Sequence, residues 1–197
     1  MSLQLEAAWE IHQFLKTRKI PYAIIGGLAV QYWGEPRFTR DVDVTTLMVF
    51  ESEAEFLSDI LNTFQPRISE ALEFALKNRV LLIRMTNGCD VDLSLGIPGY
   101  EEKVIKRAVD YGIGHSRTIK FASAEDLIIH KAVAGRPQDC SDIEGIILRQ
   151  GKRLDATYIK HWLKKFGAIL ETEEVYQRFS IPWQKFVKEN KKLKGEK

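Results

Sequence analysis

Two short and otherwise apolar runs of the sequence each carry two aspartates separated by one valine. The first run is Asp41-Val42-Asp43 and the second is Asp90-Val91-Asp92. Both lie among β-branched and aliphatic residues, so each is predicted to be a strand. Residues two apart in a strand share a face, so each pair of carboxylates points the same way and the valine points the other way. A strand that only packs against a core has little use for such a pair, which suggests a binding site.

Neighbouring ionised carboxylates repel each other, and each is unfavourable where water is scarce. A divalent cation such as Mg²⁺ turns this repulsion into binding, because it prefers hard oxygen ligands and typically takes carboxylates together with phosphate oxygens. If the two strands lie side by side, three or four of the carboxylates of Asp41, Asp43, Asp90 and Asp92 meet at one place. Thr39 shares the face of the first pair and could support it. The sequence therefore predicts a metal site.

A glycine pair, Gly26-Gly27, ends a predicted strand over 21–27 and leads into a predicted short helix that closes at Gly34 and Pro36. Glycines at such a turn let the backbone approach a phosphate closely. The start of the helix then offers free N–H groups and the positive end of its dipole. A nucleoside triphosphate would fit between this turn and the metal, with a hydroxyl attacking the α-phosphate.

The pattern along the chain changes near residue 121. Before it, predicted strands and helices are mixed, and they include a β-hairpin whose turn is Asn87-Gly88. A helix is predicted over 99–112 and a last strand over 115–122. After it, only helical patterns follow. We therefore expect an α/β or α+β domain over 1–121 and a helical domain over 122–197.

The bulk properties narrow the class of protein. The 197 residues can bury a core without disulfides, and the two cysteines lack the spacing of a metal site, which fits a reducing cytoplasm. No apolar run approaches the roughly 20 residues of a membrane span, so no membrane partner is expected. The region from Leu148 onward has 13 Lys and Arg against 6 Asp and Glu. This excess predicts either contact with a polyanion such as RNA or a solvated helical surface with a frayed lysine tail.

Gly26-Gly27, a spacer of thirteen residues and Asp41-Val42-Asp43 resemble the signature of the DNA polymerase β-like nucleotidyltransferase superfamily. Residues 122–147, "ASAEDLIIHKAVAGRPQDCSDIEGII", resemble the nucleotidyltransferase-type toxins of the AbiEii group and related minimal nucleotidyltransferases. The resemblance covers roughly residues 22–147. It implies an α/β core with a mixed sheet, flanking helices and a helical C-terminal part. It also implies that a nucleoside triphosphate such as ATP is the substrate.

The resemblance also implies two Mg²⁺ or Mn²⁺ ions held by Asp41, Asp43 and a third aspartate, which would be the catalytic residues. We assign the third role to Asp92, because it lies mid-strand among apolar residues, with Asp90 as the alternative. In the toxin-like branch a lysine at the position of Lys131 contacts the triphosphate. The competing interpretation of Lys131 is an ordinary surface lysine.

Two arginines are further candidates for binding the nucleotide. Arg40 precedes the first aspartate pair and either contacts phosphate or pairs with an acid on the opposite face. Arg136 lies close to a predicted helix start and could reach a phosphate. Near it, Asp139 is expected to cap that helix, and Asp142 is expected to pair with Lys131 or Arg136.

Two functions are compatible with these residues. The first is an enzyme that transfers a nucleoside monophosphate from a nucleoside triphosphate to a hydroxyl of an RNA 3′ end, a protein or a small molecule, with a toxin of a toxin–antitoxin pair as one form. The second is a regulatory or antitoxin subunit that binds nucleotide or a cognate partner without catalysis. A retired site usually loses an aspartate or its glycine turn. Here every element is present, which favours the enzyme.

Overall fold

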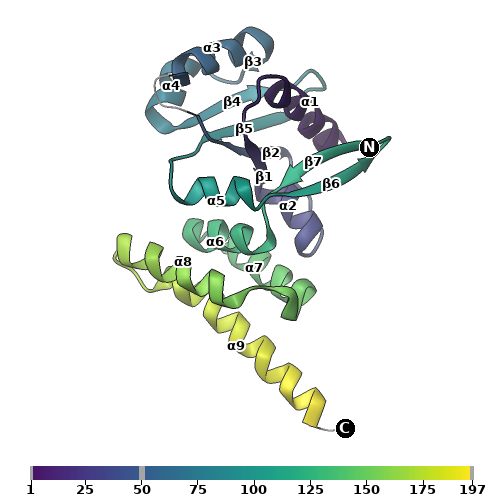
Figure 1. The fold of residues 1–197 in the computed structure, drawn as a ribbon, viewed down its shortest axis with the longest axis vertical. Helices are drawn as coiled ribbons and strands as arrows, with labels where there is room; N and C mark the ends of the chain where they lie inside the picture. The colour runs from purple at the N-terminus through teal and green to yellow at the C-terminus, as the bar shows by residue number, and fades with distance from the viewer. Residues whose placement is uncertain (1, 49–51, 196–197) are drawn as a thin grey trace. The chain divides into compact units, whose positions relative to one another are not determined.

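The computed structural model describes residues 2–48 and 52–195 (Figure 1). The chain divides into two compact units. Unit 1 contains the chain up to Ala29 together with Phe38–Ser123, and unit 2 contains Val30–Arg37 together with the chain from Ala124 onward. The sequence predicts a single boundary after residue 121. The structure differs because Val30–Arg37, early in the chain, belong to the helical unit.

Unit 1 is built on a mixed sheet, and seven of its strands lie in the described residues in the order β3-β4-β5-β2-β1-β7-β6. The pairs β2–β5 and β1–β7 are parallel, and the other neighbours are antiparallel. The predicted α/β fold class is therefore confirmed. The strands are β1 (Tyr22–Ile25), β2 (Asp41–Thr46), β3 (Gln65–Pro66), β4 (Val80–Arg84), β5 (Asp90–Leu95), β6 (Val109–Gly114) and β7 (Arg117–Phe121).

One face of this sheet carries the main core of unit 1. The side chains that alternate with the aspartates, including Ile24, Val44 and Leu93, are fully buried there. Helix α1 packs on this face, where the His12 ring is hydrogen-bonded to the Tyr22 hydroxyl. The helices that lie wholly in unit 1 are α1 (Leu3–Thr17), α3 (Glu53–Thr63), α4 (Ala71–Asn78) and α5 (Tyr100–Lys106).

The opposite face of the sheet carries the four aspartates, and α5 covers it at the other end of β2. There the Thr45 hydroxyl donates a hydrogen bond to Glu101 Oε2 at 2.8 Å. Ala23 of β1, Val104 of α5 and Ala122 form a small apolar cluster beneath the helix. This face is therefore apolar under α5 and acidic where β2 and β5 begin.

The predicted helix over 99–112 is wrong in its second half. Helix α5 ends at Lys106, and the chain then forms β6, which pairs with β7. Half-buried and exposed residues alternate along β6, which is the period of a strand rather than of a helix. His115 and Ser116 make the turn between the two strands with φ of 50° and 58°.

Unit 2 is helical, as the sequence predicts. Its helices are α6 (Ala124–Ala134), α7 (Pro137–Gln150), α8 (Ala156–Ile169) and α9 (Glu174–Gly195). Helix α9 continues through Pro182. The predicted frayed lysine tail is helical as far as Gly195, and residues 196–197 lie outside the described residues. No helix in the described part of the chain is both long and apolar enough to cross a membrane.

Helix α2 (Gly26–Trp33) begins in unit 1 and ends in unit 2. The segment that follows it is held to α7 by polar contacts within unit 2. Arg149 donates a hydrogen bond to the carbonyl oxygen of Gly34 at 2.7 Å, and Gln150 donates one to that of Trp33 at 2.6 Å. Arg37 binds Asp142 through two hydrogen bonds of 2.7 and 2.9 Å. These contacts explain why Val30–Arg37 belong to the helical unit.

Candidate active site

The register of β2 and β5 brings the two Asp-Val-Asp runs together. The strands are parallel, with Asp41 opposite Asp90 and Asp43 opposite Asp92. Paired residues of neighbouring strands lie on the same face, and the strands are about 4.8 Å apart. All four carboxylates therefore share one face at the start of both strands, as the sequence predicts.

The glycine turn lies directly against this face. Ile25, the last residue of β1, pairs with Asp43, and Gly26 follows it as the first residue of α2. Gly26 has a φ of +64°, and a Cβ there would overlap the carboxylate of Asp43. Only glycine fits both the backbone conformation and the space. Gly27, the second residue of α2, is buried.

Gly26→Ala is expected to damage both the site and the fold. The new methyl group must displace the Asp43 side chain, and the left-handed conformation adds strain. We expect a loss of roughly 1–3 kcal/mol in the free energy of unfolding. Chemical denaturation measures this loss, with Gly88→Ala as control because that glycine also has a positive φ (+83°) but open space around its Cβ position. Equal losses in the two variants would show that the contact with Asp43 is unimportant.

Asp41 is positioned by the residue expected to support it. The buried Thr39 hydroxyl donates a hydrogen bond to Asp41 Oδ1 at 3.1 Å. The Thr39 carbonyl oxygen in turn accepts a hydrogen bond from the Gln4 amide at 3.0 Å. The start of β2 is thus tied to α1. Arg40, between Thr39 and Asp41, is exposed.

Two arginines that the sequence reasoning missed bind the carboxylates of β5. Arg84 Nε donates to Asp90 Oδ1 at 2.8 Å, and Arg67 Nε lies 3.3 Å from Asp90 Oδ2. Arg67 Nη1 also donates a hydrogen bond to Asp92 Oδ1. The Arg84 partner follows from the hairpin register, since Arg84 is opposite Asp90. The partner of Arg67 could not be predicted in this way, because the preceding strand β3 is only two residues long and has no recognisable pattern.

The environments of the two β5 carboxylates differ. The hydrogen bond from Arg84 lowers the pKa of Asp90. Burial raises the pKa of Asp92, and the neighbouring Asp41 and Asp90 raise it further, although Arg67 opposes this shift. Asp92 therefore lies in the less hydrated position, where a bound cation would have most effect on its charge.

The donor set fits a divalent cation by its chemistry. Carboxylate oxygens are the ligands that Mg²⁺ and Mn²⁺ prefer, and four of them occupy one face. Within residues 2–48 and 52–195, however, no group of three acidic, histidine or cysteine side chains is already gathered around one point. Arg67 and Arg84 bind the β5 carboxylates instead.

The other two predicted nucleotide ligands, Lys131 and Arg136, belong to unit 2. The interpretation of Lys131 as a surface lysine is wrong, because it is 5% exposed. Its ammonium group lies 2.8 Å from Asp139 Oδ1 and 2.9 Å from Asp142 Oδ2. Arg136 Nε donates to Asp139 Oδ2 at 2.7 Å, while its side chain remains 73% exposed.

The expected roles of the two acids near Arg136 are confirmed. Asp139 accepts a hydrogen bond from the backbone N–H of Arg136, which caps the start of α7, and Asp142 pairs with Lys131. Burial raises the pKa of both carboxylic acids, but the hydrogen bonds from Arg136 and Lys131 to Asp139 and from Arg37 and Lys131 to Asp142 outweigh it. Both pKa values are therefore lowered.

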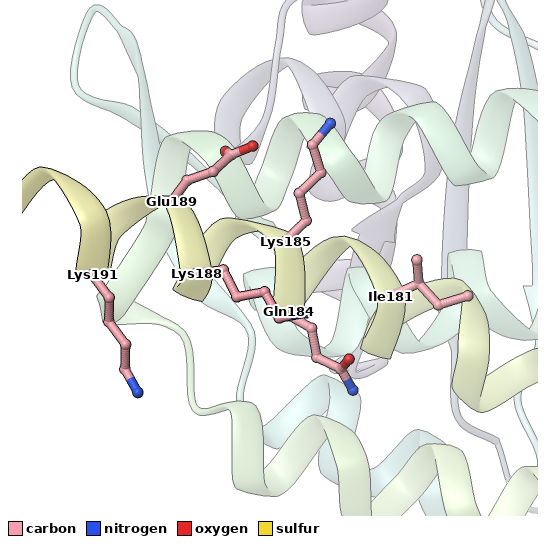
Figure 2. Close-up of a pocket in the computed structure, with 6 residues that line it drawn as sticks. All are labelled: Ile181, Gln184, Lys185, Lys188, Glu189 and Lys191. Atoms are coloured by element: carbon pink, nitrogen blue, oxygen red, sulfur yellow. The ribbon is translucent and has the colours of Figure 1, made fainter.

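A separate hollow lies along α9 and contains none of the predicted site residues (Figure 2). Three of its six lining residues are lysines, so part of the excess of basic residues after Leu148 lines this hollow. Whether this basic region binds a polyanion such as RNA or is a solvated helical surface stays a prediction. The lining residues are Ile181, Gln184, Lys185, Lys188, Glu189 and Lys191.

Three of the solved structures that this chain resembles are the following. An antigenic nucleotidyltransferase-like protein from Paracoccidioides brasiliensis has a TM-score of 0.53 and 16% identity, over 88% of this chain and 90% of that one. ANT(2")-Ia in complex with adenylyl-2"-tobramycin has a TM-score of 0.49 and 20% identity, over 85% and 95%. Lincomycin-bound lincosamide antibiotic adenylyltransferase LnuA has a TM-score of 0.48 and 11% identity, over 70% and 92%.

No curated protein matches the chain. A family model described as "Nucleotidyltransferase of unknown function (DUF6036)" matches residues 5–191, which include the glycine turn, both aspartate pairs and most of unit 2. Because this match spans nearly the whole sequence, the chain belongs to that nucleotidyltransferase family.

Proposed function

We propose that the protein transfers a nucleoside monophosphate from a nucleoside triphosphate to an acceptor hydroxyl, and that Asp41, Asp43 and Asp92 hold the divalent cation for this reaction. The observation that carries the proposal is the parallel register of β2 and β5, which sets both aspartate pairs on one face. The contact of Gly26 with Asp43 then brings the start of α2 next to the same carboxylates.

In the proposed reaction, some residues of the chain would bind the phosphates and others orient the metal ligands. The N–H groups at the start of α2 would bind phosphate oxygens, because they have no partner within the helix and lie at the positive end of its dipole. Asp43, beside Gly26, would hold the cation next to them. Thr39 orients Asp41, and the exposed Arg40 would contact a phosphate. A bound divalent ion supplies stabilisation of the attacking and leaving oxygens.

The hydrogen bonds favour Asp92 over Asp90 as the third carboxylate. Both oxygens of Asp90 face guanidinium nitrogens, one of Arg84 and one of Arg67. Asp92 is bound by Arg67 through Oδ1 and lies opposite Asp43, in the same row as Ile25, which directly precedes the glycine turn. Asp92 is therefore closer to the place where a phosphate would bind.

Label transfer tests this proposal and identifies the acceptor class. The protein is incubated with each α-³²P-labelled nucleoside triphosphate, Mg²⁺ or Mn²⁺, and in turn cell RNA, cell protein or a panel of hydroxyl-bearing small molecules. We expect label in one acceptor class, a loss of roughly a hundredfold or more in Asp92→Asn, and a much smaller loss in Asp90→Asn. The reverse order of the two variants would exchange their roles.

The toxin role and a cognate partner rest on the resemblance of residues 122–147 to the AbiEii group. Label in RNA or protein, together with arrested growth on expression, would support a toxin. The alternative is a regulatory subunit. Metal-dependent binding of a nucleotide without transfer to any acceptor class would favour that alternative and contradict the proposed reaction.

A further inference from the structure

Arg67 lies in the same row of the sheet as Asp92, with one strand, β4, between them. Pro66 of β3 is opposite Ile83 of β4, and the Arg67 N–H donates a hydrogen bond to the Leu82 carbonyl oxygen at 3.0 Å. Leu82 is opposite Asp92 of β5. Arg67, Leu82 and Asp92 therefore follow one another across the face, and the arginine side chain spans Leu82 to reach the carboxylate.

The Arg67 guanidinium binds both β5 carboxylates at once. Nη1 donates to Asp92 Oδ1, and Nε lies 3.3 Å from Asp90 Oδ2. The side chains of Arg67 and Asp92 are 24% and 31% exposed, so water screens their attraction less than at an open surface. Planar guanidinium groups are well suited to hold carboxylates in this way. The backbone of Arg67 is hydrogen-bonded to β4, and Asp92 belongs to β5, so both partners of this ion pair are fixed by the sheet.

A divalent cation and this guanidinium need the same oxygen atoms. The proposed function assigns Asp92 to the cation, whereas the structure gives Asp92 Oδ1 to Arg67. The guanidinium occupies one lone pair of that oxygen and neutralises part of the negative charge that would attract the cation. Two positive groups beside one carboxylate would also repel each other.

We propose that Arg67 is an internal counter-ion that competes with the divalent cation for the charge of Asp92, so that the cation binds more weakly while the guanidinium stays on this carboxylate. This inference rests on the proposed function. In the absence of the cation, Arg67 relieves the repulsion among the four carboxylates. It thereby sets the cation concentration at which the site is completed.

Arg84 provides a matched control on the same face. Its guanidinium contacts Asp90 but not Asp92, and its side chain is 48% exposed. Arg84→Gln removes one positive charge from the neighbourhood, as Arg67→Gln does. A general change in local charge would affect both variants alike, whereas competition at Asp92 would affect Arg67→Gln alone. Arg67→Lys keeps the charge but loses the planar fork.

The test measures Mn²⁺ binding to the full chain without nucleotide, from the electron paramagnetic resonance signal of free Mn²⁺. We expect Arg67→Gln to bind Mn²⁺ roughly three- to tenfold more tightly than the wild type, as expected for loss of one charged hydrogen bond. Arg84→Gln should stay within about twofold of the wild type, and Arg67→Lys should lie between. Melting temperatures give a second readout, because Mn²⁺ should raise that of Arg67→Gln more than that of the wild type.

Two outcomes would overturn the inference in different ways. Unchanged or weaker Mn²⁺ binding in Arg67→Gln, with binding still lost in Asp43→Asn, would show that Arg67 does not compete while the metal site itself stands. Mn²⁺ binding that is absent from the wild type, from Arg67→Gln and from Arg67→Lys would remove the metal site, and with it the proposed function. Circular dichroism establishes that each variant is folded before its binding is compared.

Discussion

Asp43→Asn should reduce nucleotidyl transfer by at least about a hundredfold while leaving the fold intact, and Asp41→Asn should do the same. An amide is neutral and binds a hard cation far more weakly than a carboxylate. Asp43 is the more exacting position, because it pairs with Ile25 on one side and Asp92 on the other and touches Gly26. No neighbouring carboxylate can take its place without moving the glycine turn.

The same substitutions remove one of several like charges from a single face. We therefore expect the melting temperature measured without metal to stay the same or rise. Label transfer and differential scanning fluorimetry on the same preparations separate the two effects. Asn substitution at Asp59, which pairs with Arg18 away from the four aspartates, serves as the control. Wild-type transfer by either active-site variant would exclude the two-carboxylate site on β2.

Lys131→Met is expected to lower the free energy of unfolding of unit 2 by roughly 2–4 kcal/mol, because two buried carboxylates lose a cation that lies between them. Asp139 and Asp142 are 1% and 2% exposed in their side chains. Arg136 and Arg37 would still bind them, which keeps the loss below that of a wholly uncompensated charge. Methionine matches the length of the lysine stem, so little cavity is created.

The pH dependence of this loss identifies its cause. A carboxyl whose pKa is lowered by folding stabilises the protein above its unfolded value of about 4, and that contribution disappears as the pH falls through the folded pKa. The pKa values of Asp139 and Asp142 are both lowered, so the difference between wild type and Lys131→Met should shrink from pH 7 to pH 3. Urea denaturation at the two pH values measures it. Unchanged stability together with weakened nucleotide binding would instead favour a phosphate contact for Lys131.

The parts of the fold that repeat with a short period could be predicted from the sequence. The alternation in the two Asp-Val-Asp runs defines their faces, and Asn87-Gly88 defines the turn of the hairpin whose second strand begins at Asp90. The same alternation exists in β6, although the sequence of that segment also suggests a helix. The sequence of a single strand does not reveal its neighbours in the sheet. The register of Asp41 with Asp90 is therefore known only from the structure.

Contacts between distant segments account for what could not be predicted. Arg67 reaches Asp92 only because the two-residue strand β3 pairs with β4. A strand so short has no periodic pattern from which it could be predicted. Arg37 joins unit 2 through Asp142, more than a hundred residues away, and its neighbours in sequence offer no sign of this. Charged residues near a predicted site can therefore have partners that only the tertiary structure reveals.

The two Asp-Val-Asp runs also protect the alignment of their own strands. If β5 slipped by one residue against β2, its aspartates would turn into the core and Val91 and Leu93 would turn toward water. If it slipped by two, the faces would be kept, but Asp43 would lose Asp92 as its neighbour. The aspartates of the site thus disfavour a one-residue slip during folding, before any substrate is present.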